Sequence, residues 1–431
     1  MLLPEDPATQ PDAPPIPPKH DPYAAFRSRP YRLFISASAL STIAGQMISA
    51  TVGWVVYEQT KDPAALAWMG LVQAIPLILF SLPAGQIADS LPRRRVMVTT
   101  QIIVTLSSTV MAYLAVIGAL SPIAIYAVLL VNGIAGTFGR PARSSVLPSL
   151  VPEGDFQSAV TWNSTMFETL GVLSPWIAGM VLAYASAAAA LVTAVVCMIG
   201  GIALTMMLPD YRIVGRREPV SFSQLMAGVR FVFRTRLMLA AMSLDLFAVL
   251  LGGATFLLPV FAERLGVGVV GYGWLRAAPP LGAIVTALII AHRAPMQHAG
   301  RALLIAVAGF GVATIFFGLS TSFWISFGAL VFCGVFDNIS VVVRHTLVQT
   351  LTPDSMRGRV SAVNQVFIGS SNDLGGFESG ITAKWFGPVA SVVGGGIGTI
   401  LVVLVVNVIF PQVRRLGSLR DLRPSDYENR K

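Results

Sequence analysis

The chain alternates between long apolar stretches and shorter polar ones. Twelve of the apolar stretches reach about 20 residues, the length with which an α-helix crosses ~30 Å of hydrocarbon. They lie at about 34–57, 67–88, 96–119, 122–142, 158–183, 185–208, 238–262, 268–291, 302–320, 322–343, 360–383 and 388–410. The alternation expected of barrel strands is absent, and backbone groups in lipid must bond internally. The pattern therefore predicts an all-α membrane protein with twelve transmembrane helices.

Composition agrees with a chain that lies mostly in lipid. Of its 431 residues 54% are hydrophobic and only 12% are charged, with a mean hydropathy of +0.71. A soluble protein carries roughly 25% charged residues. A soluble enzyme, a disordered protein and a nucleic-acid binder are poor fits, and the bilayer is the expected partner. The two cysteines, Cys197 and Cys333, offer neither a disulfide framework nor a metal site, and no cofactor is expected.

The basic residues predict the orientation in the membrane. If both termini and the even-numbered loops share one side, that side holds 26 of the 30 Lys and Arg residues. The opposite side holds only Lys61, Arg264 and Lys384, and Arg276 falls inside the eighth helix. Since positive loops stay in the cytoplasm, both termini are predicted to be cytoplasmic. The net charge of +9 then reflects insertion rather than a polyanionic partner.

Polar segments divide the chain into five parts. Residues 1–30 are predicted to be a disordered cytoplasmic tail, and 412–431 a second tail. Between them lie a six-helix bundle at 31–208, a cytoplasmic linker at 209–236 and a second six-helix bundle at 237–411. The linker contains a short amphipathic pattern that favours a helix on the inner membrane surface.

The two halves are repeats in sequence. A shift of 201 residues aligns Arg143–Asn163 with Arg344–Asn364 without a gap, and it also pairs Gly133 with Gly334 and Gly179 with Gly380. A shift of 203 aligns the glycine, alanine and proline at 70, 74 and 76 with those at 273, 277 and 279. A nearly constant offset in separate stretches indicates a parallel internal duplication.

The loop between the second and third helices carries a specific motif. It begins at Gly85, contains Asp89 and ends in three arginines from Arg93 onward. It resembles the signature of the major facilitator superfamily, with Ser90 and Pro92 where arginine and glycine are usual. The resemblance implies two six-helix bundles that rock about a central site. It also implies a cytoplasmic latch, in which the glycine allows close helix approach and the aspartate accepts bonds from arginine.

A second, narrower resemblance covers the end of the second half. Asp337–Gln349, Thr352–Asn364 and Phe377–Gly380 are similar to the branch that contains enterobactin exporters and related efflux proteins. This similarity implies a monomeric exporter of a siderophore or drug in a bacterial inner membrane. Asp373 and Gly376 stand where that branch suggests glutamine and glutamate, so an enterobactin-like substrate does not follow.

Carboxylates inside the helices are the candidates for proton coupling, because a charge in the bilayer is costly and is kept for function. Asp373 and Glu378 rank first, followed by Glu168 and then Asp245. The structural alternative is a fixed ion pair between Arg276 and whichever acid of the eleventh helix is nearer.

The remaining polar positions are assigned to a gate and a cavity. Asp337 and Arg344 lie seven positions apart on one helical face and are expected to pair at the cytoplasmic gate, which also includes Arg143. The candidates for substrate contact are polar residues at intermediate depth: Gln46, Asn132, Asn163, Asn364, Asn372 and Arg276. Asn163 and Asn364 coincide in the repeat, so a hydrogen bond between helices is their alternative role.

These patterns together predict a proton-coupled exporter of a small amphipathic molecule that works by alternating access. An importer, an uncoupled facilitator and a transporter-like receptor without net flux remain alternatives. No phosphate-binding loop or catalytic triad is apparent, so an enzyme is not expected.

Overall fold

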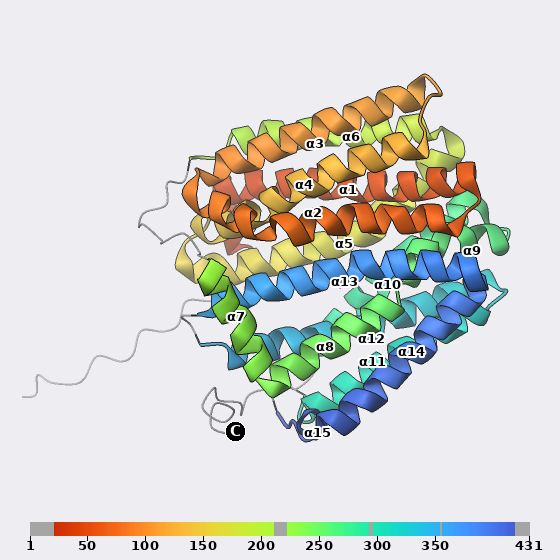
Figure 1. Ribbon diagram of the computed structural model, residues 1–431. Helices are drawn as coiled ribbons and strands as arrows, with labels where there is room; N and C mark the ends of the chain where they lie inside the picture. The colour runs from red at the N-terminus through yellow and green to blue at the C-terminus, as the bar shows by residue number, and fades with distance from the viewer. Residues whose placement is uncertain (1–20, 211–221, 293–295, 354–355, 419–431) are drawn as a thin grey trace, which may run out of the picture.

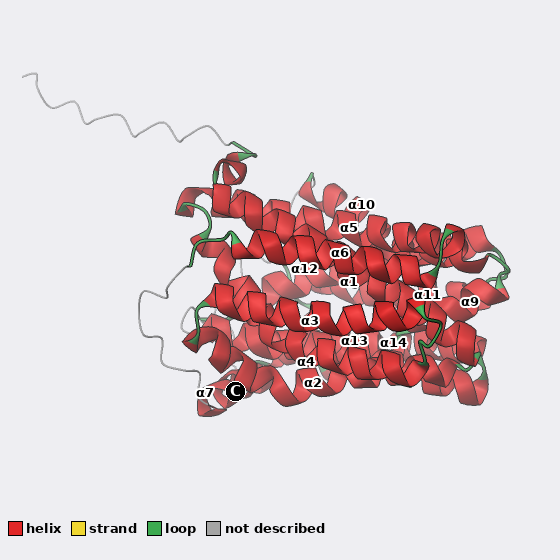
Figure 2. Cartoon of the chain, turned by 90° about the horizontal axis from the view of Figure 1, so that it is seen from above, coloured by secondary structure: helices red, strands yellow, loops and turns green. Residues whose placement is uncertain are grey.

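In the computed structural model the chain is a bundle of long helices (Figures 1 and 2). The structure describes residues 21–210, 222–292, 296–353 and 356–418. The helices of the first half are α1 (Arg29–Thr60), α2 (Pro63–Ser90), α3 (Arg93–Val116), α4 (Pro122–Val146), α5 (Phe156–Tyr184) and α6 (Ala187–Met206). After α7 (Phe222–Arg234) come α8 (Arg236–Leu251), α9 (Leu258–Arg264), α10 (Gly268–Ala291), α11 (Ala299–Leu319), α12 (Phe323–Leu351), α13 (Arg357–Phe386), α14 (Pro388–Ile409) and α15 (Pro411–Arg414).

Eleven described helical segments are long and apolar enough to cross a bilayer, if α8 and α9 are taken together. The twelfth is α13, which at 30 residues is long enough but more polar, because it contains Asp373, Glu378 and Lys384 as well as basic residues at its start. The predicted twelve-helix, all-α fold is confirmed.

Several helices begin at side-chain caps that the hydropathy pattern does not show. Ser28, Asp62, Ser121 and Ser186 each accept a hydrogen bond from a backbone N–H of the first turn. Two of these helices, α1 and α2, therefore begin about one turn before the predicted apolar segments. At its other end, α12 continues to Leu351 rather than residue 343.

The seventh predicted span, 238–262, is interrupted. The α8 helix stops before Gly252, a short 3-10 helix follows at Ala254–Leu257, and α9 then begins with Pro259 in its first turn. The α13 helix packs against this break, because a Cβ on Gly253 would lie 2.6 Å from the carbonyl oxygen of Gly375. Expecting a continuous helix here was wrong, since two glycines allow a close approach that a regular helix would block.

Part of each predicted tail packs against the bundle. Residues 1–20 and 419–431 lie outside the described part of the chain. Within the segment predicted to be disordered, Tyr23 packs on Trp162 of α5, and the backbone carbonyl of Pro22 accepts a bond from the indole N–H. At the other end, the Ala299 amide of α11 donates to the Gly417 carbonyl, which holds the chain after α15 against the bundle.

The internal duplication is visible in helix packing. Gly133 of α4 faces the ring of Pro76 in α2, and its repeat partner Gly334 of α12 faces the backbone of Pro279 in α10. Helix pairs α2–α13 and α5–α10 are the corresponding contacts between the halves. Gly179 meets Gly273 in one pair, and Gly380 meets the start of α2 in the other. Small residues thus bring backbones together at equivalent places.

This packing yields a test with a matched pair of glycine substitutions. Gly334→Ala places a Cβ against the Pro279 carbonyl, whereas Gly394→Ala in α14 meets no heavy atom within 4 Å. We expect Gly334→Ala to lower stability by about 1–3 kcal/mol, as overpacked cores do. Gly394→Ala should leave it unchanged or slightly raised. Thermal unfolding of the detergent-purified variants measures both, and equal melting temperatures would contradict the close packing.

Candidate transport site at the boundary between the halves

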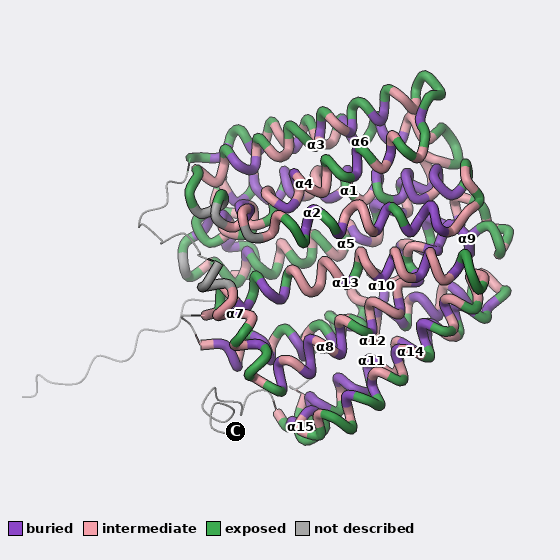
Figure 3. Tube along the Cα trace, in the orientation of Figure 1, coloured by how far each residue is buried: buried purple, intermediate pink, exposed green. Residues whose placement is uncertain are grey.

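The buried apolar cluster that joins the two halves lies at one end of the bundle. We call the end that carries both described termini and α7 the basic end, and the end that carries the α1–α2 turn the opposite end (Figure 1). One apolar cluster draws on both halves and fills the opposite end, with Val56 from the first half and Phe261 and Leu275 from the second (Figure 3). The two clusters at the basic end each belong to a single half. Among the described apolar clusters, the one that joins the halves therefore lies at the opposite end, which we call the closed end.

Two ion pairs connect the halves at the closed end. Lys61, just after α1, contacts Glu263 of α9 at 2.7 Å, and Lys384 of α13 contacts Asp62 at 2.7 Å. Sequence reasoning noted the lysines only as exceptions in the charge distribution. The sequence did contain a signal for these pairs, because basic and acidic residues both occur near helix ends on that side. All four side chains are partly exposed to solvent.

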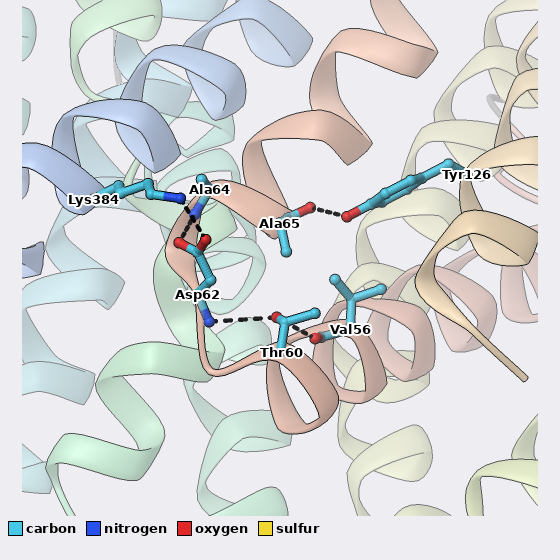
Figure 4. A network of polar contacts seen from close by, with 7 residues as sticks. All are labelled: Val56, Thr60, Asp62, Ala64, Ala65, Tyr126 and Lys384. Atoms are coloured by element: carbon cyan, nitrogen blue, oxygen red, sulfur yellow. Dashed lines mark hydrogen bonds and ion pairs between the residues drawn. The ribbon is translucent and has the colours of Figure 1, made fainter.

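Asp62 joins the second ion pair to the start of α2 (Figure 4). One carboxylate oxygen accepts from the Ala64 amide at 3.0 Å and the other from the Lys384 ammonium group. The hydrogen bond from Lys384 is the main reason that the pKa of Asp62 lies below its usual range, against the opposing effect of partial burial. Tyr126 of α4 donates to the Ala65 carbonyl in the same turn. This ion pair therefore attaches α13 to an anchored helix start.

Two carboxylates near the middle of their helices belong to opposite sides of the boundary. Glu168 of α5 and Asp337 of α12 belong to different halves and lie within electrostatic range of each other. The described residues form no ion pair with either carboxylate, and Asp337 retains an exposed side chain. Sequence reasoning placed Asp337 at a gate and Glu168 behind the acids of α13. A single sequence does not show which face of one helix lies against which face of another.

The other predicted acids have different surroundings. Asp373 of α13 lies on the side of α2, where its carbonyl is close to Gly70, and it is attracted electrostatically by Arg140 of α4. Glu378 is half-buried and accepts a weak bond from the Ser379 hydroxyl. The alternative of a fixed pair with Arg276 is wrong for both acids, because Arg276 instead donates to Ser49 and to the Tyr272 hydroxyl, each at 3.1 Å.

The predicted pairing of Asp337 with Arg344 is also wrong. Arg344 is buried and forms its ion pair with Asp245 of α8. Asp245 lies on the neighbouring helix at the height of Arg344, so it meets the guanidinium more directly than an acid two turns away on the same helix. A buried, paired carboxylate is a structural contact, so Asp245 is the weakest of the proton candidates.

The predicted cytoplasmic latch is only partly within the described part of the chain. A Cβ on Gly85 would have no heavy atom within 4 Å, so the expected close helix approach is absent. The Asp89 side chain lies outside the described part of the chain. Arg93 donates to the Ser145 carbonyl, and Arg143 makes a long 3.5 Å bond to the Ser38 carbonyl. These last contacts stay within the first half.

The predicted substrate-contact residues do not form one cluster. Asn132 bonds Ser107 and Ser108 of α3 inside the first half, and Asn372 bonds its own helix. Gln46 and Asn163 are half-buried and Asn364 is buried. Within the described part of the chain no side-chain hydrogen bond involves these last three residues.

Two like halves of transmembrane helices, closed at one end and bearing carboxylates at their boundary, define a secondary membrane transporter rather than an enzyme. The sequence model of a family described as transmembrane secretion effector matches residues 20–428. The chain therefore belongs to this family of the major facilitator superfamily and resembles enterobactin exporters within it.

Curated relatives and solved structures agree with this assignment. The enterobactin exporter EntS of Escherichia coli O1:K1 is 23% identical over 400 residues, which cover 91% of this chain and 93% of the exporter. The same exporter of Shigella boydii serotype 18 aligns to the same extent. Among solved structures, the nucleoside transporter NupG has a TM-score of 0.72 at 12% identity, covering 89% of this chain and 100% of NupG. A D-xylose–proton symporter reaches 0.69 at 12% identity, covering 90% and 98%. These structures share the fold.

The ion pairs at the closed end predict a shift in conformation. We expect Lys61→Gln and Lys384→Gln each to favour the state open at the opposite end by up to about fivefold, since exposed ion pairs contribute about 1 kcal/mol or less. Distances between spin labels on the two halves at that end measure the shift. Arg264→Gln is the control, because Arg264 lies over Phe261 of its own helix.

The low pKa of Asp62 sets the pH range of this effect. The carboxylate stabilises the closed end fully above the ordinary aspartate pKa of about 4, and this contribution is lost as the pH falls through its lower folded value. The effect of Lys384→Gln should therefore be equal at pH 6 and pH 8. A distance distribution that responds as strongly to Arg264→Gln would contradict the assignment.

The buried pair predicts asymmetric effects on stability. Asp245→Asn leaves the Arg344 charge uncompensated and should cost about 3–5 kcal/mol. The double variant Asp245→Leu with Arg344→Met removes both charges, and its melting temperature should lie closer to wild type. If the melting temperature of the double variant is no higher than that of Asp245→Asn, the broken ion pair does not cause the loss of stability.

Proposed function

We propose that the protein exports a small amphipathic molecule in exchange for protons, by alternating access, in a bacterial inner membrane. The observation that carries this proposal is that Glu168 and Asp337 lie on helices of opposite halves, within electrostatic range of each other, and that neither forms an ion pair with a described residue. Rocking of the halves changes the distance between groups on opposite sides of that boundary. The affinity of these carboxylates for protons then differs between the two states, which is what coupling requires.

The charge distribution supports the direction. If the basic end is cytoplasmic, this conformation is inward-facing, with its closed end toward the outside. An exporter takes up its cargo in this state. The relatives named above are exporters, whereas the structural neighbours include a symporter, so the fold alone does not decide direction.

The carboxylate pair now precedes the acids of α13 as the proton site. Two like charges in a confined space favour a proton on one of them. Asp373 has a cation within electrostatic range, and Asp245 is bound to Arg344, so both have compensation that Glu168 and Asp337 lack. Glu378 remains a second candidate because it is half-buried and makes no ion pair with a described residue.

The cargo class rests on the relatives and on the bilayer setting. The enterobactin exporters described above are named for their siderophore, and similarity at 23% identity suggests a siderophore or drug of comparable amphipathic character. Asp373 and Gly376, which depart from the pattern expected for that branch, lie on the helix that packs against the first half. A cargo different from enterobactin is therefore expected.

Transport in reconstituted vesicles under an imposed pH gradient tests the proposal. A panel of catecholate siderophores and fluorescent drugs serves as cargo. We expect Glu168→Gln and Asp337→Asn each to abolish accumulation driven by the gradient, because one carboxylate alone no longer repels a second. Cargo exchange without a gradient should persist.

Glu58→Gln is the matched control, since Glu58 is exposed near the end of α1. Asp373→Asn and Glu378→Gln are compared in parallel. If loss of coupling follows Glu378 alone, the proton site lies on α13. Movement that ignores the gradient in every variant would indicate a facilitator, and saturable binding without movement would indicate a receptor.

A further inference from the structure

A cavity lies inside the first half, away from the pair of carboxylates. It has a volume of about 350 Å³ and is enclosed by α1, α3, α4 and α6. This volume is within the usual range for small-molecule sites. The cavity reaches from Arg143, near the end of α4, to Asn132, a distance of ~16 Å along the helix.

The charge in the cavity has one sign. Arg140 and Arg143 both line it, and none of its lining residues is acidic. In the described part of the chain neither arginine forms an ion pair. Arg143 has only its long bond to the Ser38 carbonyl. Two cations that line one cavity, with no carboxylate in its lining, favour an anion between them.

The rest of the lining specifies more than charge. The side-chain amide oxygen of Gln101, Oε1, is buried and has no hydrogen-bond partner among the described residues. It follows Thr100, which contacts Gly139, the residue before Arg140, so this acceptor lies within about one turn of the arginines. Met97 and Met198 supply adaptable apolar walls. A ligand that satisfies all three features has an anionic group, a neighbouring hydrogen-bond donor and an apolar body.

The cavity is also connected to the boundary between the halves. A Cβ on Gly369 of α13 would lie 4.0 Å from a guanidinium nitrogen of Arg140, and Asp373, one turn further along α13, attracts the same arginine. An anion bound in the cavity therefore competes with Asp373 for Arg140.

We propose that this cavity binds an amphipathic organic anion with a hydrogen-bond donor beside its charge, held by Arg140, Arg143 and Gln101. The proposal deepens the transport function given above, on which it rests, by naming the class of cargo. An anionic lipid headgroup with its acyl chain has the same chemistry, so the experiment must separate the two sources.

Binding of 3-hydroxy-2-naphthoate to the purified protein in phosphatidylcholine nanodiscs tests the site by isothermal titration calorimetry. We expect saturable binding that is at least tenfold weaker for the neutral 3-hydroxy-2-naphthamide. Arg140→Gln and Arg143→Gln should each weaken naphthoate binding about tenfold. Arg95→Gln should leave it unchanged, because Arg95 is exposed on α3 and does not line the cavity.

Two further variants distinguish a specific site from a generally basic surface. Gln101→Leu should weaken 3-hydroxy-2-naphthoate more than 2-naphthoate, which lacks the donor. Asp373→Asn should strengthen binding several-fold, since it releases Arg140. A merely structural role for these residues would not produce a gain in affinity. Equal binding of the acid and the amide, or no response to Arg140→Gln and Arg143→Gln, would overturn the proposal.

Nanodiscs that contain phosphatidylglycerol separate cargo from lipid. Naphthoate binding that persists there supports a cargo site. Co-purified phosphatidylglycerol that is lost in Arg143→Gln, with no naphthoate binding in either disc, would overturn the cargo assignment in favour of a lipid.

These measurements use no gradient, so they fail independently of the transport assay. Absent binding with intact pH-driven transport refutes only the cavity. Binding without any transport refutes only the proposed function.

Discussion

Close backbone contact between the halves is the constraint on which the rest of the structure depends. In lipid there is little hydrophobic gain when one apolar helix leaves its neighbours for another, so helix association relies on packing. Glycines provide it here where α2 meets α13 and where α5 meets α10. These two contacts bring Asp373 toward the first half and Glu168 toward the second.

The boundary contains two kinds of electrostatic contact that respond differently to motion. The pairs at the closed end join opposite charges in partly solvated surroundings, and the proposed rocking of the halves would form or break them. Glu168 and Asp337 are like charges within electrostatic range, so their interaction opposes close approach unless a proton is present. One kind of contact favours this conformation and the other makes it sensitive to protonation. The buried pair of Asp245 and Arg344 lies within one half and is unaffected by the motion.

Much of the fold was predictable from the sequence, because apolar length and repeat offset are properties of the chain itself. Gly133 and Gly334 align when the sequence is shifted by 201 residues, and in the structure each faces a proline of a neighbouring helix. The site was harder to predict. The partners of Arg344, Arg276 and Lys384 depend on rotation about helix axes and on relative helix heights, which hydropathy does not encode. The break at Gly252 was likewise hidden, because its flanking residues are as apolar as those of a continuous helix.

The scarcity of basic residues at the opposite end gives the molecule an unequal sensitivity to its surroundings. Topology leaves three such residues there, and two of them are used to hold the halves together. At physiological ionic strength the screening length is about 8 Å, and it shortens as salt rises. The medium on that side of the membrane therefore acts on the very charges that keep the transporter closed, whereas the paired charges within the second half are shielded from it. The salt concentration at that end of the molecule becomes a physical input to how firmly the halves are held together there.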